Sequence, residues 1–197
     1  MNQKPSDVTI LTVARFILLA LIILFLLTGI VQAAMFVMQD AGAQELVQRF
    51  GYFGVLVVAF IAGLNAIVPV PAGSFVPIFT AAGLWMPLII TSLVIGTMLA
   101  DLLAFYLGMK GREIAVSRYP RIKRLTEWIQ DGKSRYIVPV VFLHATISPL
   151  PNEVLLVPLA LAGVRMRTLI IPLLLGTIIY QSAFAFGVQN LFIYFVG

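Results

Sequence analysis

Long apolar runs, separated by short polar segments, dominate the chain. The first run, Phe16 to Met38, has about the twenty residues that a helix needs to cross the hydrocarbon core of a bilayer. It is longer than the core of a signal peptide, which has roughly 7 to 15 residues. The pattern therefore predicts a retained N-terminal transmembrane helix, followed by an amphipathic connection from Gln39 to Gly51 at the membrane surface.

Two later apolar segments are each interrupted by prolines. The first runs from Tyr52 to Leu84 with a break at residues 68–74, and the second begins at Tyr136 with a break at residues 148–153. A helix is hard to continue through either break, because proline lacks an amide hydrogen and restricts the residue before it. Each arm is too short to cross the bilayer, so we expect two re-entrant helical hairpins. The residues that break them are Pro69, Pro71, Gly73, Pro149 and Pro151.

An uninterrupted apolar run follows each broken segment. Pro87 to Met109 and about Thr168 to Asn190 are both long enough to span a membrane. Between the two halves, Lys110 to Arg135 carries eight of the thirteen lysines and arginines. The predicted organisation is an N-terminal helix and connection (residues 1–51), a first hairpin and helix (52–109), a basic loop (110–135), and a second hairpin and helix (136–197).

A shift of eighty residues superposes the two halves, as the separation of Pro69 from Pro149 illustrates. Prolines, glycines and threonines at one fixed offset are harder to obtain by chance than a match between leucine-rich runs. The sequence therefore predicts one unit used twice. Other pairs at this offset are Pro71 and Pro151, Ala82-Gly83 and Ala162-Gly163, Met86 and Met166, and Gly96-Thr97 and Gly176-Thr177.

The distribution of positive charge predicts how these units are oriented. Lysine and arginine favour the cytoplasmic side of a membrane, which places Lys4, Arg15 and the basic loop there. The chain then crosses outward at its first helix, inward at residues 87–109 and outward at residues 168–190. The two repeats are therefore expected to be inverted, in a multi-pass protein of the plasma (inner) membrane of a prokaryote with a cytoplasmic N-terminus.

Composition narrows the class further. Apolar residues make up 61% of the chain and charged residues 11%, whereas globular domains are roughly 45 to 50% apolar and about 25% charged. The net charge of +5 is concentrated in the basic loop, which argues against nucleic acid as a partner. With no cysteine and the single histidine His144, we expect no metal site and no cofactor. The fold class is predicted as an all-α integral membrane protein.

Asp101 and Glu153 are the acidic candidates for a transport site. An ionised carboxylate in mid-membrane is costly unless it is paired or hydrated, so Asp101 should face the protein interior. It could carry a proton or bind a cation, or it could make a structural hydrogen bond to a hairpin backbone. Glu153 and Asn152 follow the second break and could address a cavity or cap the returning helix. Asn65, just before the first break, has the same two interpretations.

The other polar features allow weaker predictions. His144 could titrate near neutral pH on the entering arm of the second hairpin, but Ser148 beside it lacks a nucleophile motif, so we do not expect an enzyme. The basic loop is interpreted as a topology signal or as an interfacial helix that touches anionic lipid. Broken helices at membrane depth are typical of transporters, and their freed amides favour an anionic headgroup.

Short motifs occupy corresponding places in the two units. They are Pro69-Val70-Pro71-Ala72-Gly73, Ala82-Gly83, Ala100-Asp101 and Phe105-Tyr106 in the first, and Pro149-Leu150-Pro151-Asn152 and Ala162-Gly163 in the second. From Tyr52 to Gly187 this series resembles the DedA family, also called the VTT or SNARE-associated Golgi protein domain. The resemblance implies lipid flipping or scrambling, including return of a polyprenyl phosphate carrier, often with proton coupling.

Four positions differ from the pattern that this resemblance implies. Ser74 stands where many bacterial members carry a glutamate, which makes Ser74 a further pathway candidate. His144 is the nearest basic residue where members carry arginines on the second hairpin. Ala100 and Phe105 replace a common glycine and tyrosine.

The expected function is translocation of an anionic lipid, either a polyprenyl phosphate or a phospholipid. A secondary transporter or channel for a small solute or ion would use the same cavity. A non-transporting membrane scaffold is the third alternative. The expected partners are membrane lipids, and the pattern is compatible with a homo-oligomer.

We predict that single cysteines introduced at Ser74 and Glu153 will be labelled from opposite sides of the membrane. Opposed hairpin tips would expose each position to a different aqueous compartment, and the chain has no native cysteine to interfere. The measurement is labelling of intact and opened vesicles with a membrane-impermeant maleimide. Protection of both positions from both sides would show that these segments span fully.

Overall fold

The computed structural model describes residues 5–64, 71–130, 136–148 and 150–196. Within these ranges every regular element is a helix, which confirms the all-α fold class. Three of the predicted positions, Asn65, Pro69 and Pro149, lie outside the described residues.

Four of the described helices are long and apolar enough to cross a membrane. They indicate a membrane protein, as the apolar runs predict. Two of them extend beyond their predicted ends: α1 begins before the first apolar run, and α9 continues through the apolar residues after Asn190. These helices are α1 (Pro5–Gln39), α2 (Ala41–Gly63), α4 (Met86–Lys110) and α9 (Met166–Val196).

The predicted surface connection is itself helical and continues into α2. Asp40 starts α2, because its Oδ1 accepts a hydrogen bond from the backbone N–H of Ala43 at 2.7 Å. Gly51 then interrupts the helix with φ 51° and ψ −143°. The part after Gly51 is roughly 18 Å long at 1.5 Å per residue, which is short of a hydrocarbon core of about 30 Å.

Short helices follow both predicted breaks. In the first half, α2 ends at Gly63, and the chain resumes as the 3-10 helix η1 (Ala72–Phe75) and α3 (Val76–Ala81). In the second half, α7 (Ile137–Ile147) ends before Ser148, and α8 (Glu153–Leu161) begins after Asn152. The helix is therefore interrupted in both apolar segments.

The two halves share the same turn before their long helices. Gly83 has φ 82° and Gly163 has φ 87°, a region that favours glycine because it has no Cβ. The residue after each glycine donates its N–H to the carbonyl five residues earlier, at 3.1 Å after Gly83 and 3.0 Å after Gly163. This is the hydrogen bond of a Schellman motif. The long helices then begin at Met86 and Met166, again eighty residues apart.

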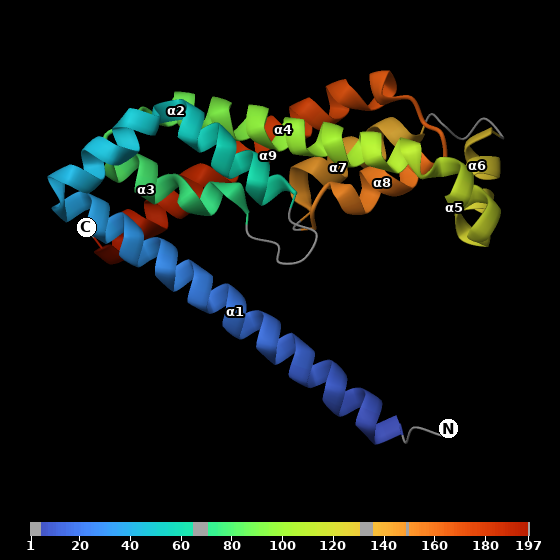
Figure 1. The fold of residues 1–197 in the computed structure, drawn as a ribbon, viewed down its shortest axis with the longest axis horizontal. Helices are drawn as coiled ribbons and strands as arrows, with labels where there is room; N and C mark the ends of the chain where they lie inside the picture. Colours follow the sequence, from blue (N-terminus) through green and yellow to red (C-terminus); the bar gives the residue numbers. More distant parts are fainter. Residues whose placement is uncertain (1–4, 65–70, 131–135, 149, 197) are drawn as a thin grey trace.

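The two halves pack across each other. Helix α4 contacts α2 of its own half and α8 of the other half, while α9 contacts α7 and also η1 and α3 (Figure 1). Apolar residues from both halves, including Val94, Phe105 and Leu156 in one group and Val55, Leu93 and Ala185 in another, form two buried clusters. Neither half buries its apolar surface alone.

Glycine lets each long helix approach the entering helix of its own half. A Cβ on Gly96 would lie 2.4 Å from the carbonyl oxygen of Leu56. One on Gly176 would lie 2.6 Å from the Cβ of Ala145. Small residues at such crossings are the usual means of close helix packing in membrane proteins.

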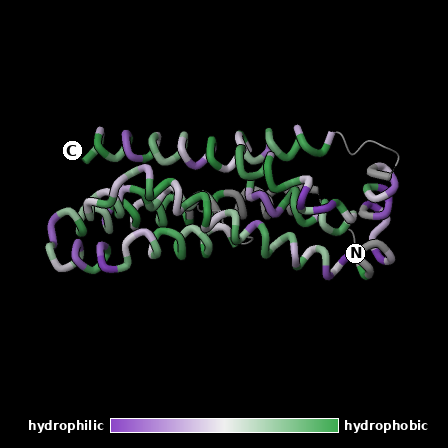
Figure 2. Tube along the Cα trace, turned by 90° about the horizontal axis from the view of Figure 1, so that it is seen from above, coloured by the Kyte–Doolittle hydropathy of each residue, from purple (hydrophilic) through white to green (hydrophobic). Residues whose placement is uncertain are grey.

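The predicted basic loop contains two short helices, α5 (Arg112–Arg118) and α6 (Pro120–Gln130). Figure 1 places α5, α6 and the start of α1 toward one end of the molecule and the end of α9 toward the other. Figure 2 shows mainly apolar residues along the helices between the two ends. This arrangement puts six of the thirteen lysines and arginines, those from Lys110 to Arg124, at one end of the apolar helices.

We predict that Gly176→Ala will lower the free energy of unfolding by about 1 to 3 kcal/mol, as overpacking does elsewhere. The added methyl group would collide with Ala145 of α7. Gly187→Ala is the matched control in α9, because nothing lies within 4 Å of its added Cβ. Thermal unfolding in detergent measures the stability of both variants. An equal loss of stability in both would contradict the close approach of α9 to α7.

Candidate functional site

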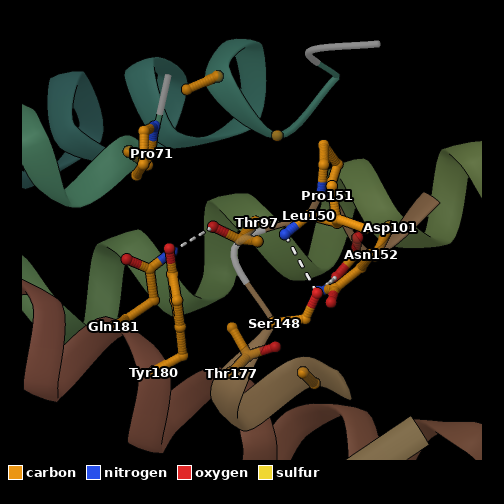
Figure 3. Close-up of a pocket in the computed structure, with 14 residues that line it drawn as sticks. Pro71, Thr97, Asp101, Ser148, Leu150, Pro151, Asn152, Thr177, Tyr180 and Gln181 are labelled. Carbon is orange, nitrogen blue, oxygen red and sulfur yellow. Dashed lines mark hydrogen bonds between the residues drawn. The ribbon is translucent and has the colours of Figure 1, made fainter. Parts of the chain in front are cut away.

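A cavity of about 90 Å³ with both polar and apolar lining residues lies where the helix breaks meet the middle of α4 and α9 (Figure 3). One side comes from the end of α2 and the start of η1, and the other from the break between α7 and α8. The polar lining residues are Thr97, Asp101, Ser148, Asn152, Thr177, Tyr180 and Gln181, and the others are Ala62, Gly63, Pro71, Ala72, Ala145, Leu150 and Pro151.

Asp101 and Asn152 connect α4 to the start of α8. Asn152 Nδ2 donates to Asp101 Oδ2 at 2.8 Å, and only 2% of the Asp101 side chain is exposed. Asn152 is the N-cap residue of α8, yet its side chain makes no capping hydrogen bond there. Its amide is therefore used on the carboxylate, where a hydrogen bond to a charged group contributes about 1.5 to 3 kcal/mol.

Thr97 and Gln181 make the contact between α4 and α9. Gln181 Nε2 donates to Thr97 Oγ1 at 3.0 Å. On its other side, Gln181 Oε1 lies beside η1, 3.5 Å from where a Cβ on Gly73 would stand. Asp101 thus faces the start of α8, and Gln181, eighty residues later, faces η1.

Three buried polar atoms around these contacts have no hydrogen-bond partner among the described residues: Ser74 Oγ, Thr177 Oγ1 and Gln181 Oε1. Thr177 and Gln181 line the cavity with exposed fractions of 2% and 3%. An unpaired buried polar group costs roughly 1 to 3 kcal/mol. Such groups point to a water or ligand that supplies the missing partner.

The other predicted candidates lie around the cavity and do not line it. Glu153, half-buried at the start of α8, directly follows Asn152 in the chain. His144 Nε2 lies 3.5 Å from the carbonyl oxygen of Pro151, between α7 and α8 in the sequence. Ser74 is buried in η1. The structure therefore brings together Asp101 and Asn152, with Glu153 next in the chain, and places Ser74 in the other half.

Five polar lining residues were absent from the predicted site: Thr97, Ser148, Thr177, Tyr180 and Gln181. The eighty-residue shift contained a signal for three of them, since it pairs Thr97 with Thr177 and Asp101 with Gln181. Ser148 stands in the second break, where its Oγ accepts a hydrogen bond from the N–H of Leu150 at 3.1 Å. Nothing in the sequence singled out Tyr180.

The chemistry of the cavity is hydrogen bonding around one charge. Asp101 is the only acidic or basic residue in the described lining. In the described part of the chain, no three His, Asp or Glu residues form a group that could hold a metal ion. The described lining is thus rich in oxygen atoms and contains no basic side chain.

Comparison with known proteins found no match: no family model, no curated protein and no solved structure matches this chain. Function is therefore argued from the geometry of the cavity and from the motifs in the sequence.

We predict that Asn152→Ala will lower the free energy of unfolding by about 1.5 to 3 kcal/mol, because it leaves the buried carboxylate without its amide donor. The loss of unfolding free energy should be smaller in an Asp101→Ala background, because no carboxylate is then left without a donor. A double-mutant cycle measured by unfolding in detergent gives this coupling. Asn190→Ala, at an exposed amide of α9, is the control, and additive effects of the two cavity variants would contradict the contact.

Proposed function

We propose that this protein is a lipid transporter of the DedA type, which moves a polar headgroup through the Asp101 cavity while the acyl chains stay in the bilayer. The observation that carries this proposal is a cavity with polar lining residues at two helix breaks within a largely apolar molecule. Irregular backbone at membrane depth is tolerated where it is buried in protein or lines a watery cavity. Transporters use such broken helices for their binding sites.

Two inverted copies of one unit are the proposed architecture. The matched turns at Gly83 and Gly163 and the matched starts of α4 and α9 support a repeated unit. Cross-packing of each returning arm on the long helix of the other half supports a two-fold relation between the units. The units are inverted if α4 crosses inward and α9 outward, with both hairpins re-entrant.

The distribution of charge supports the orientation of this proposal. Helices α5 and α6 and the start of α1 lie toward the same end of the molecule (Figure 1), and α5 and α6 belong to the basic segment. The positive-inside rule makes this end cytoplasmic. The C-terminus of α9 is then on the outer side.

The proposed substrate is an anionic lipid, and the lining limits how its headgroup is held. Hydroxyl and amide groups of Thr97, Thr177 and Gln181 can donate to phosphate oxygens, whereas the Asp101 carboxylate repels them. The headgroup therefore needs a positive partner at Asp101, either a proton or another cation. This requirement links movement of the lipid to the charge state of one residue.

A transporter for a small solute or ion is the second candidate. The cavity volume of about 90 Å³ suits such a substrate, because one water molecule needs only about 10 to 15 Å³ of space measured in this way. The described cavity thus holds several water-sized groups. Passage of a whole headgroup requires the hairpins to move apart.

We predict that liposomes containing the purified protein will move fluorescent phospholipid or polyprenyl phosphate between leaflets. Asp101→Asn should lower the initial rate by about tenfold or more, which corresponds to a barrier higher by roughly 1.4 kcal/mol. Glu153→Gln should have a smaller effect, because Glu153 does not line the cavity. The measurement is quenching of labelled lipid in the outer leaflet over time.

The matched control is Glu45→Gln, which removes an exposed carboxylate near the start of α2. It should leave the rate unchanged. If the folded wild-type protein moved neither lipid, with or without a pH gradient, lipid transport would be excluded and solute transport would become the leading proposal.

A further inference from the structure

The cavity lining has the chemistry of a site for a small cation. It offers the carboxylate of Asp101, the hydroxyls of Ser148 and Thr177, and the side-chain carbonyl of Asn152. Carboxylate, hydroxyl and carbonyl oxygens are the ligands that hard cations prefer. Of the described lining residues, none is a lysine, arginine or histidine that would compete with a bound cation.

Hydrogen bonds hold some of these oxygens in place and leave others available. The amide of Asn152 donates to Asp101 Oδ2, which fixes the carboxylate between α4 and the start of α8. Ser148 Oγ accepts from the N–H of Leu150 and is thereby fixed at the break. Thr177 Oγ1 is buried and has no partner among the described residues. Figure 3 shows Ser148 beside Asn152 and Asp101, with Thr177 below Ser148 in that view.

One hydrogen bond between α4 and α9 has no counterpart at the positions related to it by the eighty-residue offset. Thr97 accepts a direct hydrogen bond from Gln181 at 3.0 Å. At the eighty-residue offset, the corresponding pair is Thr177 and Asp101. Thr177 Oγ1 makes no hydrogen bond, so this pair is not in direct contact although both residues line the cavity. A bound ion or water between them would complete the second contact.

We propose that the cavity binds a small monovalent cation on Asp101, with Ser148, Asn152 and Thr177 as neutral oxygen ligands. One carboxylate balances one positive charge, and a volume of about 90 Å³ accommodates a small ion with a few water molecules. The inference rests on the proposed function, because the cation supplies the positive charge that an anionic headgroup requires. The same chemistry fits a free alkali ion and the primary ammonium group of a lipid.

The test is thermal unfolding of the purified protein in an uncharged detergent at constant ionic strength. The salts are the chlorides of sodium, potassium, ethanolammonium and N-methylglucammonium, the last being too large for the cavity. We expect a small cation at roughly ten times its Kd to raise Tm by about 3 °C or more relative to N-methylglucammonium. A shift with sodium or potassium identifies a free ion, and a shift with ethanolammonium alone identifies a lipid amine.

Three variants separate site binding from a general salt effect. Asp101→Asn should abolish the shift, and Thr177→Val should raise the cation concentration needed for half of the shift by about tenfold. Glu45→Gln, which removes an exposed carboxylate, should retain the full shift. If Asp101→Asn does not fold, Thr177→Val decides the question alone.

Equal Tm values in all four salts, or the same shift in wild type and Thr177→Val, would overturn the cation site. Because the binding test needs no bilayer, it is independent of lipid transport. A protein that binds the cation but moves no lipid refutes the proposed function alone. A protein that moves lipid equally fast in N-methylglucammonium chloride, and shows no shift in Tm, refutes the cation site alone.

Discussion

Backbone polar groups that are released where a helix is interrupted must find partners within the protein, because hydrocarbon offers none. The described residues of the second break meet this constraint locally. Ser148 accepts from the N–H of Leu150, and the carbonyl of Asn152 accepts from the first turn of α8. The turns at Gly83 and Gly163 satisfy the ends of α3 and α8. Seven polar side chains beside the breaks line one cavity.

Polar side chains that line the cavity also stabilise the fold, because they join elements that lie far apart in the sequence. Asp101 accepts a hydrogen bond from Asn152 at the start of α8, and Gln181 donates one to the middle of α4. These buried polar contacts fix how α4 is positioned against both α8 and α9, since a slide of α4 by one turn relative to both would break the two hydrogen bonds. A change in activity on substitution at these positions must therefore be judged together with the effect on stability.

The sequence predicted the helices and the helix breaks well, because long apolar runs and prolines act locally. It also predicted that Asp101 faces the protein interior, because a charged side chain is costly in lipid. It did not predict that Asn152 binds Asp101 instead of capping α8, or that Tyr180 lines the cavity. Both depend on how α4, α8 and α9 meet in space, and Tyr180 is one of several aromatic residues in an apolar helix without a local signal.

The cross-packing of the two halves has a consequence for how the protein is made. Helix α4 is synthesised first, and Asn152, the partner of Asp101, follows 51 residues later. At a synthesis rate of about 5 to 20 residues per second, Asn152 is made roughly 3 to 10 seconds after Asp101. An aspartate at the centre of a helix costs about 2.5 to 3.5 kcal/mol on insertion, so the leucines and isoleucines around it must hold α4 in the membrane during that interval. Part of the apolar content of α4 therefore serves its biogenesis as well as the finished fold.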